Sequence, residues 1–449
     1  MPSLSFTPFE ESLYVDDCPA YPWNILFRLT FDGPLDRAVF DRAQAAVVRR
    51  HPLLRAAARR SKLGRFSWVW PDDGSPTSPV RVHWNEHTVG SWPVVRRLPL
   101  EQGSTLDIWA SEAAGRTEVL LHFQHVAVDG LGAVQVIGDL LLAYDAYSRG
   151  ASPAWPPLDD AILRRRGTYG YNAIKFLRNL TKLSVGLRGV KQFLARKPVP
   201  LLPHEPAVRT MPQPATYPAL LTHAFTTADT QSLLAAARAS DATLNDLLAR
   251  DLLLALHQWR ERRSTVPDDE WLRLLVPVNM RTPEDQAMPA ANVMSTVFLD
   301  RDGAQLRGDA TALLHSVHDE MALIKRNDLG LIYLLSLRVS GIFPGVMERA
   351  VHKQKFCCTA ILTNIMRPLE TLPLPRCDGR LQAGPVHLDD LEFFAPVRPL
   401  TCASFGIATY AGRLHVSLQA DSRFLSASDI NELQGCYVEQ ISRSLRSAP

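Results

Sequence analysis

The sequence predicts a mixed α/β protein built from two lobes. Its 449 residues exceed one ordinary domain, which favours two units of about 200 residues each. Runs with period-two alternation, typical of strands, and runs with apolar residues every three or four positions, typical of helices, occur in both halves. We expect an N-terminal lobe over residues 1–160, a connection over residues 161–215 and a C-terminal lobe over residues 216–449.

The most informative stretch runs from Thr117 to Asp145, because it combines a strand, a sharp break and a helix. Alternation through Phe123 predicts a strand, and Asp129-Gly130 interrupts the apolar run before helical spacing resumes. His125 therefore lies at a strand end, four residues before a carboxylate. That arrangement suits a general base with a positioned acid, but taken alone it favours a hydrogen-bonded structural histidine.

The remaining elements of the N-terminal lobe follow from the same two periods. Pro52 cannot continue a helix, so the helix before it must end near Arg50. The predicted strands are 24–32, 66–70, 80–84 and 106–110, and the predicted helices are 35–50 and 131–147.

The C-terminal half also mixes both element types. Thr243 or Asp241 could cap a helix that starts at Leu244, and an acid such as Asp246 in its first turn is favoured by the helix dipole. The predicted strands are 219–225, 271–277, 292–299, 357–367, 400–409 and 414–419, the last two forming an antiparallel pair. The predicted helices start near Ala228, Leu244, Gly330 and Ser426, and the one from Gly330 to Met347 is expected to be buried or to line a channel.

The predicted connection carries a basic, helix-like segment. Residues 161–197 contain ten Lys or Arg and no acid, with leucine and valine at three- and four-residue intervals opposite the charges. One interpretation is a helix packed on the body with a solvated basic face. Two others are contact with an anionic membrane surface and binding of the phosphates of a coenzyme A or carrier-protein donor.

Bulk properties exclude several classes of protein. A net charge of +3 favours no nucleic-acid partner, and the first residues lack the basic and apolar regions of a signal peptide, so we expect a cytoplasmic protein. The six cysteines show no C-x-x-C pair, His315 and His318 suit a solvated helix face, and no Gly-rich phosphate loop is present. We expect no bound metal and no bound cofactor.

Four separated stretches match one family in the correct order. They are Gly33 to Asp36 leading to His51-Pro52-Leu53-Leu54-Arg55, then Gln124 to Gly130, Ala242 to Asp246, and Val276 to Arg281. With these stretches the chain resembles the condensation-domain and HxxxD acyltransferase superfamily, which has the fold of chloramphenicol acetyltransferase. The family motif HHxxxDG has glutamine, Gln124, at its first position here, and the DFGWG segment of plant-type members is missing. The resemblance is therefore nearest to stand-alone condensation enzymes, wax ester synthases and alcohol acyltransferases.

The resemblance implies a two-lobed fold with an active-site tunnel between the lobes. It assigns catalysis to His125, with Asp129 as an orienting residue that pairs with Arg281, and Gly130 as a position for close backbone approach. Supporting positions are Gln124, Asn245 and Asn364, of which Asn364 is similar to the "SN" loop near the family's tunnel. Asn292 matches a position usually written "GN".

The implied activity is acyl transfer from a thioester of coenzyme A or phosphopantetheine to an alcohol or amine acceptor. His125 would act as the base, without an acyl-enzyme. Two alternatives stay open: a stand-alone peptide-synthetase-type condensation enzyme served by carrier proteins in trans, and a catalytically silent module that recruits carrier proteins.

Overall fold

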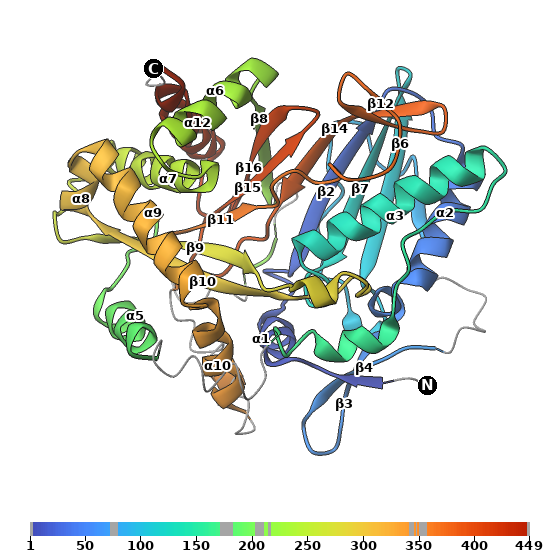
Figure 1. Ribbon diagram of the computed structural model, residues 1–449, viewed down its shortest axis with the longest axis horizontal. Helices are drawn as coiled ribbons and strands as arrows, with labels where there is room; N and C mark the ends of the chain where they lie inside the picture. The colour runs from blue at the N-terminus through green and yellow to red at the C-terminus, as the bar shows by residue number, and fades with distance from the viewer. Residues whose placement is uncertain are drawn as a thin grey trace.

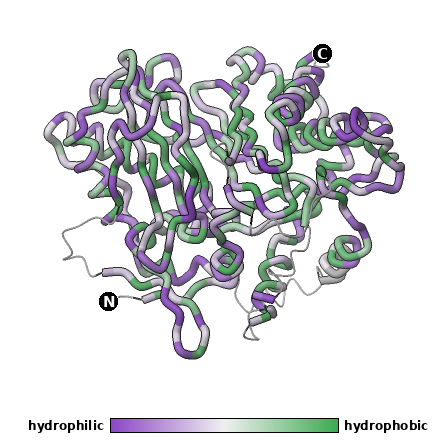
Figure 2. Tube along the Cα trace, turned by 180° about the vertical axis from the view of Figure 1, so that it is seen from behind, coloured by the Kyte–Doolittle hydropathy of each residue, from purple (hydrophilic) through white to green (hydrophobic). Residues whose placement is uncertain are grey.

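The computed structural model describes residues 3–71, 80–170, 183–202, 211–213, 217–340, 345–346, 348–349 and 357–446. Two large sheets, one in each half of the molecule, carry helices packed against them (Figure 1). The strands inside each half are largely hydrophobic, whereas the peripheral loops are largely hydrophilic (Figure 2). Each sheet is surrounded by its own cluster of buried apolar side chains. The predicted mixed α/β class is confirmed.

A seven-stranded sheet forms the N-terminal half. Its order is β12-β13-β14-β2-β7-β6-β5, in which β5 and β6 are parallel and the other neighbours are antiparallel. Helices α2 and α3 pack against each other over one face of this sheet (Figure 1). The bounds are β2 Asn24–Phe31, β5 Val82–Trp84, β6 Leu106–Ala113, β7 Arg116–Gln124, β12 Arg376–Cys377, β13 Arg380–Ala383, β14 Val386–Phe394, α2 Arg37–Arg50 and α3 Gly130–Ser148.

A six-stranded sheet forms the C-terminal half, in the order β10-β9-β11-β15-β16-β8. Strand β11 is parallel to both of its neighbours, and α7 packs between α9 and α12. The bounds are β8 Ala219–Ala224, β9 Trp271–Asn279, β10 Met294–Asp302, β11 Ala360–Asn364, β15 Ala403–Tyr410, β16 Arg413–Ala420, α6 Thr227–Ala239, α7 Leu244–Glu261, α8 Gly303–Arg307, α9 Ala310–Arg326 and α12 Ala427–Arg446.

Smaller elements lie between and below the two sheets. Helices α1 and α10 contact each other, and β4 lies between β1 and β3 in a three-stranded sheet. The bounds are β1 Ser3–Ser5, β3 Ala57–Arg60, β4 Phe66–Val69, α1 Pro8–Asp16, α5 Leu183–Ala195, α10 Gly330–Ser340, and the 3-10 helices η1 Pro52–Arg55, η2 Leu100–Gln102, η3 Asp160–Arg165 and η6 Pro283–Asp285.

The chain crosses between the halves in a way that the predicted boundaries miss. Strand β14 pairs with β2, so that Phe393 lies opposite Phe27 and Leu391 opposite Leu29. Residues 376–394 therefore belong to the N-terminal sheet, although we assigned residues 216–449 to the C-terminal lobe. The sheets meet where Gly406 of β15 faces β14, and a Cβ on Gly406 would lie 2.4 Å from Phe393 O. Glycine is required at this close approach.

Two predicted segments differ from the structure. Helix α10 is buried only along one face, since Leu335 is 43% and Val339 60% exposed, so the first of the two expectations for this segment, a buried helix, does not hold in full. Leu331, Leu334 and Leu335 line a cavity, and residues 341–344 and 347 of the segment lie outside the described residues. In the predicted connection over 161–215, residues 171–182, 203–210 and 214–215 lie outside the described residues.

The described charges of the connection divide between protein partners and solvent, since Arg164, Lys191 and Lys197 are exposed. Arg166 is buried and pairs with Glu10, Arg165 pairs with Glu284, and the Arg196 guanidinium lies 4.4 Å from the Trp271 ring. Leu194, on α5, is 71% exposed rather than packed on the body. The first interpretation therefore holds only in part for the described residues: several basic side chains face solvent, but the apolar stripe is not packed on the body at Leu194. Among the described residues, no helix is long and apolar enough to cross a membrane.

Candidate active site around His125

His125 follows the last residue of β7, and hydrogen bonds of its backbone fix its position. Its N–H donates to Trp23 O at 2.7 Å, and its carbonyl accepts from Asn292 Nδ2 at 2.7 Å. The chain then turns through residues 126–129 into α3, whose N-terminus is capped by Asp129. This local order, a strand, a short turn and a capped helix, is the one that the sequence predicts.

The His125 imidazole is oriented through one nitrogen. Nδ1 lies 3.1 Å from Val128 O, and because a carbonyl can only accept, Nδ1 carries the proton. Within the part of the chain that the structure describes, Nε2 makes no hydrogen bond. Burial lowers the pKa of His125 below its usual value, against the effect of the Asp129 charge, and the Trp23 ring packs edge-on at 5.5 Å. Nε2 is thus an unprotonated, basic nitrogen at neutral pH.

Asp129 has the predicted partner and further ones. Arg281 donates to both carboxylate oxygens, at 2.7 and 2.9 Å, and the N–H groups of Gly132 and Val293 donate at 2.8 Å each. Burial raises the pKa of Asp129, but Arg281 and these N–H groups hold it below its usual value. The carboxylate contacts no atom of the imidazole by a hydrogen bond, so Asp129 shapes the loop and caps α3 rather than relaying a proton.

Residues 290–293, between β9 and β10, form what we call the clamp segment. Ala291 O accepts from Arg281 Nη2 at 2.9 Å and from Asp129 N at 3.3 Å, while Asn292 and Val293 donate to the His125 loop as described above. A Cβ on Gly132 would lie 2.8 Å from Ala291 O, so the segment fits closely against the start of α3. Sequence reasoning noted Asn292 as a motif position but missed the function of this segment.

Gln124 does not face the imidazole of His125. Its Nε2 donates to Asp17 Oδ2 at 3.1 Å, and its Oε1 accepts from Val126 N at 3.2 Å. Asp17 also pairs with Arg97 and accepts from Trp23 N. Burial raises the pKa of Asp17 to about 6, against the effect of Arg97. Gln124 therefore ties the loop to the segment that carries Trp23, a contact that no sequence signal indicated.

The two predicted asparagines form a separate pair. Asn364 Nδ2 donates to Asn245 Oδ1 at 3.3 Å, which joins the end of β11 to the first turn of α7. A Cβ on Gly130 would lie 3.0 Å from Ile365 Cγ2. Ile365, the residue that follows β11, therefore packs close to the His125 loop. Asp246 caps α7 together with Thr243 and also contacts His318 Nδ1 at 2.9 Å. The structure thus brings His125, Asp129, Gly130, Gln124 and Arg281 into one cluster, with the asparagine pair beside it.

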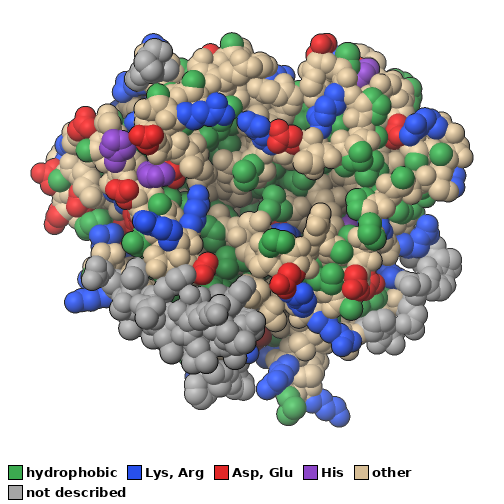
Figure 3. All heavy atoms as spheres, in the orientation of Figure 1, with side chains coloured by type: hydrophobic (Ala, Val, Ile, Leu, Met, Phe, Trp, Pro, Cys, Tyr) green, Lys and Arg blue, Asp and Glu red, His purple; other side chains and the backbone are tan. Residues whose placement is uncertain are grey.

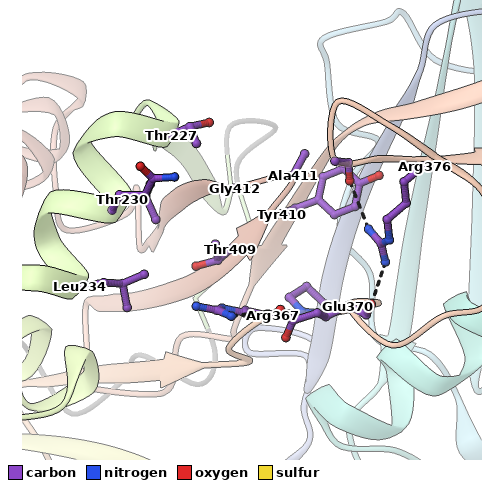
Figure 4. Close-up of a pocket in the computed structure, with 13 residues that line it drawn as sticks. Thr227, Thr230, Leu234, Arg367, Glu370, Arg376, Thr409, Tyr410, Ala411 and Gly412 are labelled. Atoms are coloured by element: carbon purple, nitrogen blue, oxygen red, sulfur yellow. Dashed lines mark hydrogen bonds and ion pairs between the residues drawn. The ribbon is translucent and has the colours of Figure 1, made fainter.

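Two cavities of the described structure, both larger than a third beside α2 and α3, are lined by none of the predicted site residues. One of about 360 Å³ is lined by α6, the β15–β16 turn and Arg367, Glu370 and Arg376 (Figure 4), and it contains none of the predicted site residues. The other, of about 700 Å³, lies between residues 4–8, the segment after η3 and α10. Its lining is mainly apolar, with Arg164 and Arg338 among the polar groups. Hydrophobic side chains also gather in the middle of the face shown in Figure 3, between the two halves.

Comparisons with known proteins agree with this architecture. No family model matches the chain. It is 22% identical to an uncharacterised protein of Mycobacterium tuberculosis strain H37Rv over 97% of this chain and 98% of that protein. It is 27% identical to a probable non-canonical nonribosomal peptide synthetase of Salinispora arenicola over 44% of this chain, which is 3% of that protein.

Solved structures resemble the whole chain. The first condensation domain of the calcium-dependent antibiotic synthetase, in complex with a substrate analogue, matches with a TM-score of 0.72 at 17% identity, over 100% of this chain and 98% of that one. A starter condensation domain of rhizomide synthetase, in complex with C8-CoA and Leu-SNAC, gives 0.69 at 14% identity over 99% and 95%. Polyketide synthase associated protein 5 of M. tuberculosis gives 0.62 at 16% identity over 99% of both chains. This chain has the condensation-domain fold.

Proposed function

We propose that this chain, which has the condensation-domain fold, is an acyltransferase. It moves an acyl group from a thioester to a hydroxyl or amine acceptor, with His125 as the general base. The thioester belongs to coenzyme A or to a carrier protein. The observation that carries this proposal is the fixed tautomer of His125, in which Nδ1–H is held by Val128 O and Nε2 makes no hydrogen bond to the described residues. Nδ1 thus satisfies the usual requirement that a buried polar group has a hydrogen-bond partner, and Nε2 is left to accept a proton.

The chemistry that this arrangement supports is a direct transfer. Nε2 accepts the proton of the acceptor O–H or N–H while the acceptor atom forms a bond to the thioester carbon. The tetrahedral intermediate then collapses, the C–S bond breaks, and the imidazolium returns its proton to the leaving thiolate. The low pKa of His125 supports both halves of this cycle, because the base is neutral before the attack and acidic after it.

The cavity of about 700 Å³ supports an acyl donor with an aliphatic chain. Its volume falls within the ordinary range of small-molecule sites, about 300–1,000 Å³, and its apolar wall includes Leu331, Leu334 and Leu335. We assign the acyl chain to this cavity.

The direct test measures thiol release from acyl-coenzyme A donors of increasing chain length, in the presence of mixed alcohols and amines. We expect acceptor-dependent release that falls by about 10²–10⁴-fold in His125→Ala, as for loss of a general base. His315→Ala, at an exposed position of α9, is the matched control and should retain full activity. Acceptor-dependent release that survives in His125→Ala would overturn the assignment of the base.

A matched pair of variants tests the assignment of the acyl chain to this cavity. Leu335→Trp narrows the cavity and should shift the preference towards shorter acyl chains. Leu323→Trp adds the same bulk at a similarly exposed leucine, 39% against 43%, but on α9 away from the cavity, and should leave the preference unchanged. An unchanged preference in Leu335→Trp would place the acyl chain elsewhere.

A second candidate function is amide-forming condensation with carrier-bound donors in trans, because the likeness to the peptide-synthetase condensation domain extends over the whole chain. This function would be supported if the wild-type protein shows no thiol release with any acyl-coenzyme A donor but turns over a carrier-bound donor in a His125-dependent way. Binding of a carrier protein without any turnover would select the recruitment module.

A further inference from the structure

His51 is a second buried histidine, at the end of α2, and it uses both of its ring nitrogens. Ala290 N–H donates to Nδ1 at 3.0 Å, and Nε2 lies 3.0 Å from Asp139 Oδ2 on α3. Because an amide N–H can only donate, Nδ1 must be unprotonated and Nε2 must carry the proton. The side chain has no exposed surface. Only one tautomer, and only the neutral form, satisfies both contacts.

Ala290 is the first residue of the clamp segment. The next three residues hold Asp129 through Ala291 O and Val293 N, and His125 through the Asn292 side chain. The imidazole of His51 therefore lies one residue away from the contacts that orient the His125 loop. It joins α2 and α3 to a segment that comes from the other half of the molecule.

We propose that His51 is a positioning residue for the acyl-transfer site: in its neutral form it seats the clamp segment against the His125 loop, and its protonation releases that segment. The proposal rests on the proposed function, and it adds an acid-sensitive control of the same site. In the protonated form Nδ1–H would face Ala290 N–H, so two donors would oppose each other and the contact would be lost.

The charged groups around His51 come from three elements. Asp139 of α3 accepts from Nε2, Arg50 of α2 donates to the same carboxylate at 2.5 Å, and Asp160 of η3 acts at longer range. Burial lowers the pKa of His51, against the hydrogen bond and charge of Asp139. Since Arg50 already satisfies the charge of Asp139, that carboxylate does not force protonation of the imidazole.

Loss of the His51 contact should act locally. The residues just before the clamp segment have independent attachments, because Gln135 Nε2 donates to Met288 O at 3.1 Å and Asp159 N donates to Ala287 O at 2.8 Å. These contacts keep the loop on the N-terminal half when the Ala290 bond is broken. A small displacement of residues 290–293 would still move the base.

Two substitutions of His51 distinguish the contribution of Nδ1 from that of Nε2. In His51→Asn the side-chain oxygen reaches the position of Nδ1 and keeps the acceptor for Ala290 N–H, whereas His51→Gln places its amide near Nε2 and leaves Ala290 N–H without an acceptor. The readouts are hydrogen exchange of a peptide covering residues 288–294 and steady-state kinetics with the best donor. His257→Asn, at a buried histidine of α7, is the matched control.

We expect faster exchange of this peptide in His51→Gln, and a decrease in kcat of about tenfold to a hundredfold with KM little changed, as for a misplaced base. His257→Asn should resemble the wild type at neutral pH, and His51→Asn, which keeps the acceptor for Ala290 N–H, should lose less protection and less kcat than His51→Gln. As the pH is lowered below the ordinary histidine pKa of about 6.5, the wild type should gain exchange, after correction for intrinsic rates, and His51→Asn should not, because asparagine is not protonated in this range. Because burial lowers the pKa of His51, the gain should begin below pH 6.5.

Equal exchange in wild type and His51→Gln, or equal acid sensitivity in wild type and His51→Asn, would overturn the proposal. The exchange measurement needs no turnover. A protein that proves inactive with every donor would therefore contradict the proposed function while leaving the role of His51 decided by exchange alone.

Discussion

The two sides of the His125 loop are built differently. On the clamp side, the Asp129 carboxylate accepts four hydrogen bonds of 2.7 to 2.9 Å, two of them from the Arg281 guanidinium. On the other side, Asn364 and Asn245 share one neutral bond of 3.3 Å. Charge-assisted bonds are roughly twice as strong as neutral ones. The difference indicates that the His125 loop is held rigidly on one side and less tightly on the other, and under the proposed function the second side would adapt to substrate.

The largest effect is expected from breaking the clamp side at Arg281. Arg281→Met leaves the buried Asp129 carboxylate without its guanidinium, and removing one partner of a buried pair costs about 3–5 kcal/mol. Since the Arg281 side chain is 20% exposed, we expect the lower end of this range for the free energy of unfolding in urea. Acyl transfer should fall as well, because the His125 loop loses its orientation.

Two further variants control for this prediction. Arg281→Met combined with Asp129→Asn removes the unpaired charge and should recover part of the lost stability. Arg367→Met breaks an exposed pair with Glu370 and should cost no more than about 1 kcal/mol. Equal losses in Arg281→Met and Arg367→Met would show that the Asp129 pair is no stronger than a surface ion pair.

Acid should weaken the histidine-rich strand and loop independently of Arg281. His122, three residues before His125, is buried, and burial lowers its pKa to about 3. The unfolded chain takes up a proton near pH 6.5, whereas the folded protein does not. The folded state is therefore fully stabilised above about pH 6.5, and this stability is lost by about 1.4 kcal/mol per pH unit as the pH falls below it.

The measurement is the free energy of unfolding of wild type and His122→Gln against pH. Gln cannot be protonated, so the difference between the two proteins should change by about 2 kcal/mol between about pH 6.5 and about pH 5. The charge of His87 adds to the effect of burial on the pKa of His122, and the His122 ring stacks on Trp92, so the pH-dependent part of the difference reports the buried site as a whole. Parallel stability curves would mean that His122 is already charged, or accessible to water, in the folded protein.

Gln124 offers a smaller change where the His125 loop is tied to Asp17. Gln124→Leu leaves Val126 N–H without its acceptor and removes one donor from Asp17, and a buried unsatisfied group costs about 1–3 kcal/mol. We expect urea unfolding to show a loss in this range, with kcat reduced because the turn after His125 is less well held. Gln124→Glu keeps the acceptor for Val126 N–H but adds a carboxyl beside Asp17, so its loss of stability should grow with pH.

Local features of this chain could be predicted from its sequence. The cap at Thr243, the antiparallel pair β15–β16 and the strand, turn and helix around His125 all depend on residues close together in the chain. The Arg281–Asp129 pair could also be predicted, because the resemblance supplied the partner of a motif residue.

Contacts between distant segments could not be predicted in this way. Nothing in residues 386–394 indicates that they pair with β2, and nothing in His51-Pro52 indicates a bond to Ala290. Both contacts depend on where the chain returns to the N-terminal half. The spacing of apolar residues in a segment predicts whether it forms a helix or a strand. Which other segment it pairs or bonds with depends on the tertiary structure.

The smallest effect is expected at the asparagine pair. Asn364→Ala removes the bond to Asn245 and the acceptor for Met366 N–H, both partly accessible to water, and should cost about 1 kcal/mol in urea unfolding. If this side adapts to substrate, KM should rise more than kcat falls, the reverse of the expectation for Arg281→Met. Asn245→Ala and the double variant complete a cycle in which the coupling should not exceed about 1 kcal/mol. A loss of kcat in Asn364→Ala as large as that in Arg281→Met would mean that both sides orient the base, and that the contrast in hydrogen bonding has no counterpart in catalysis.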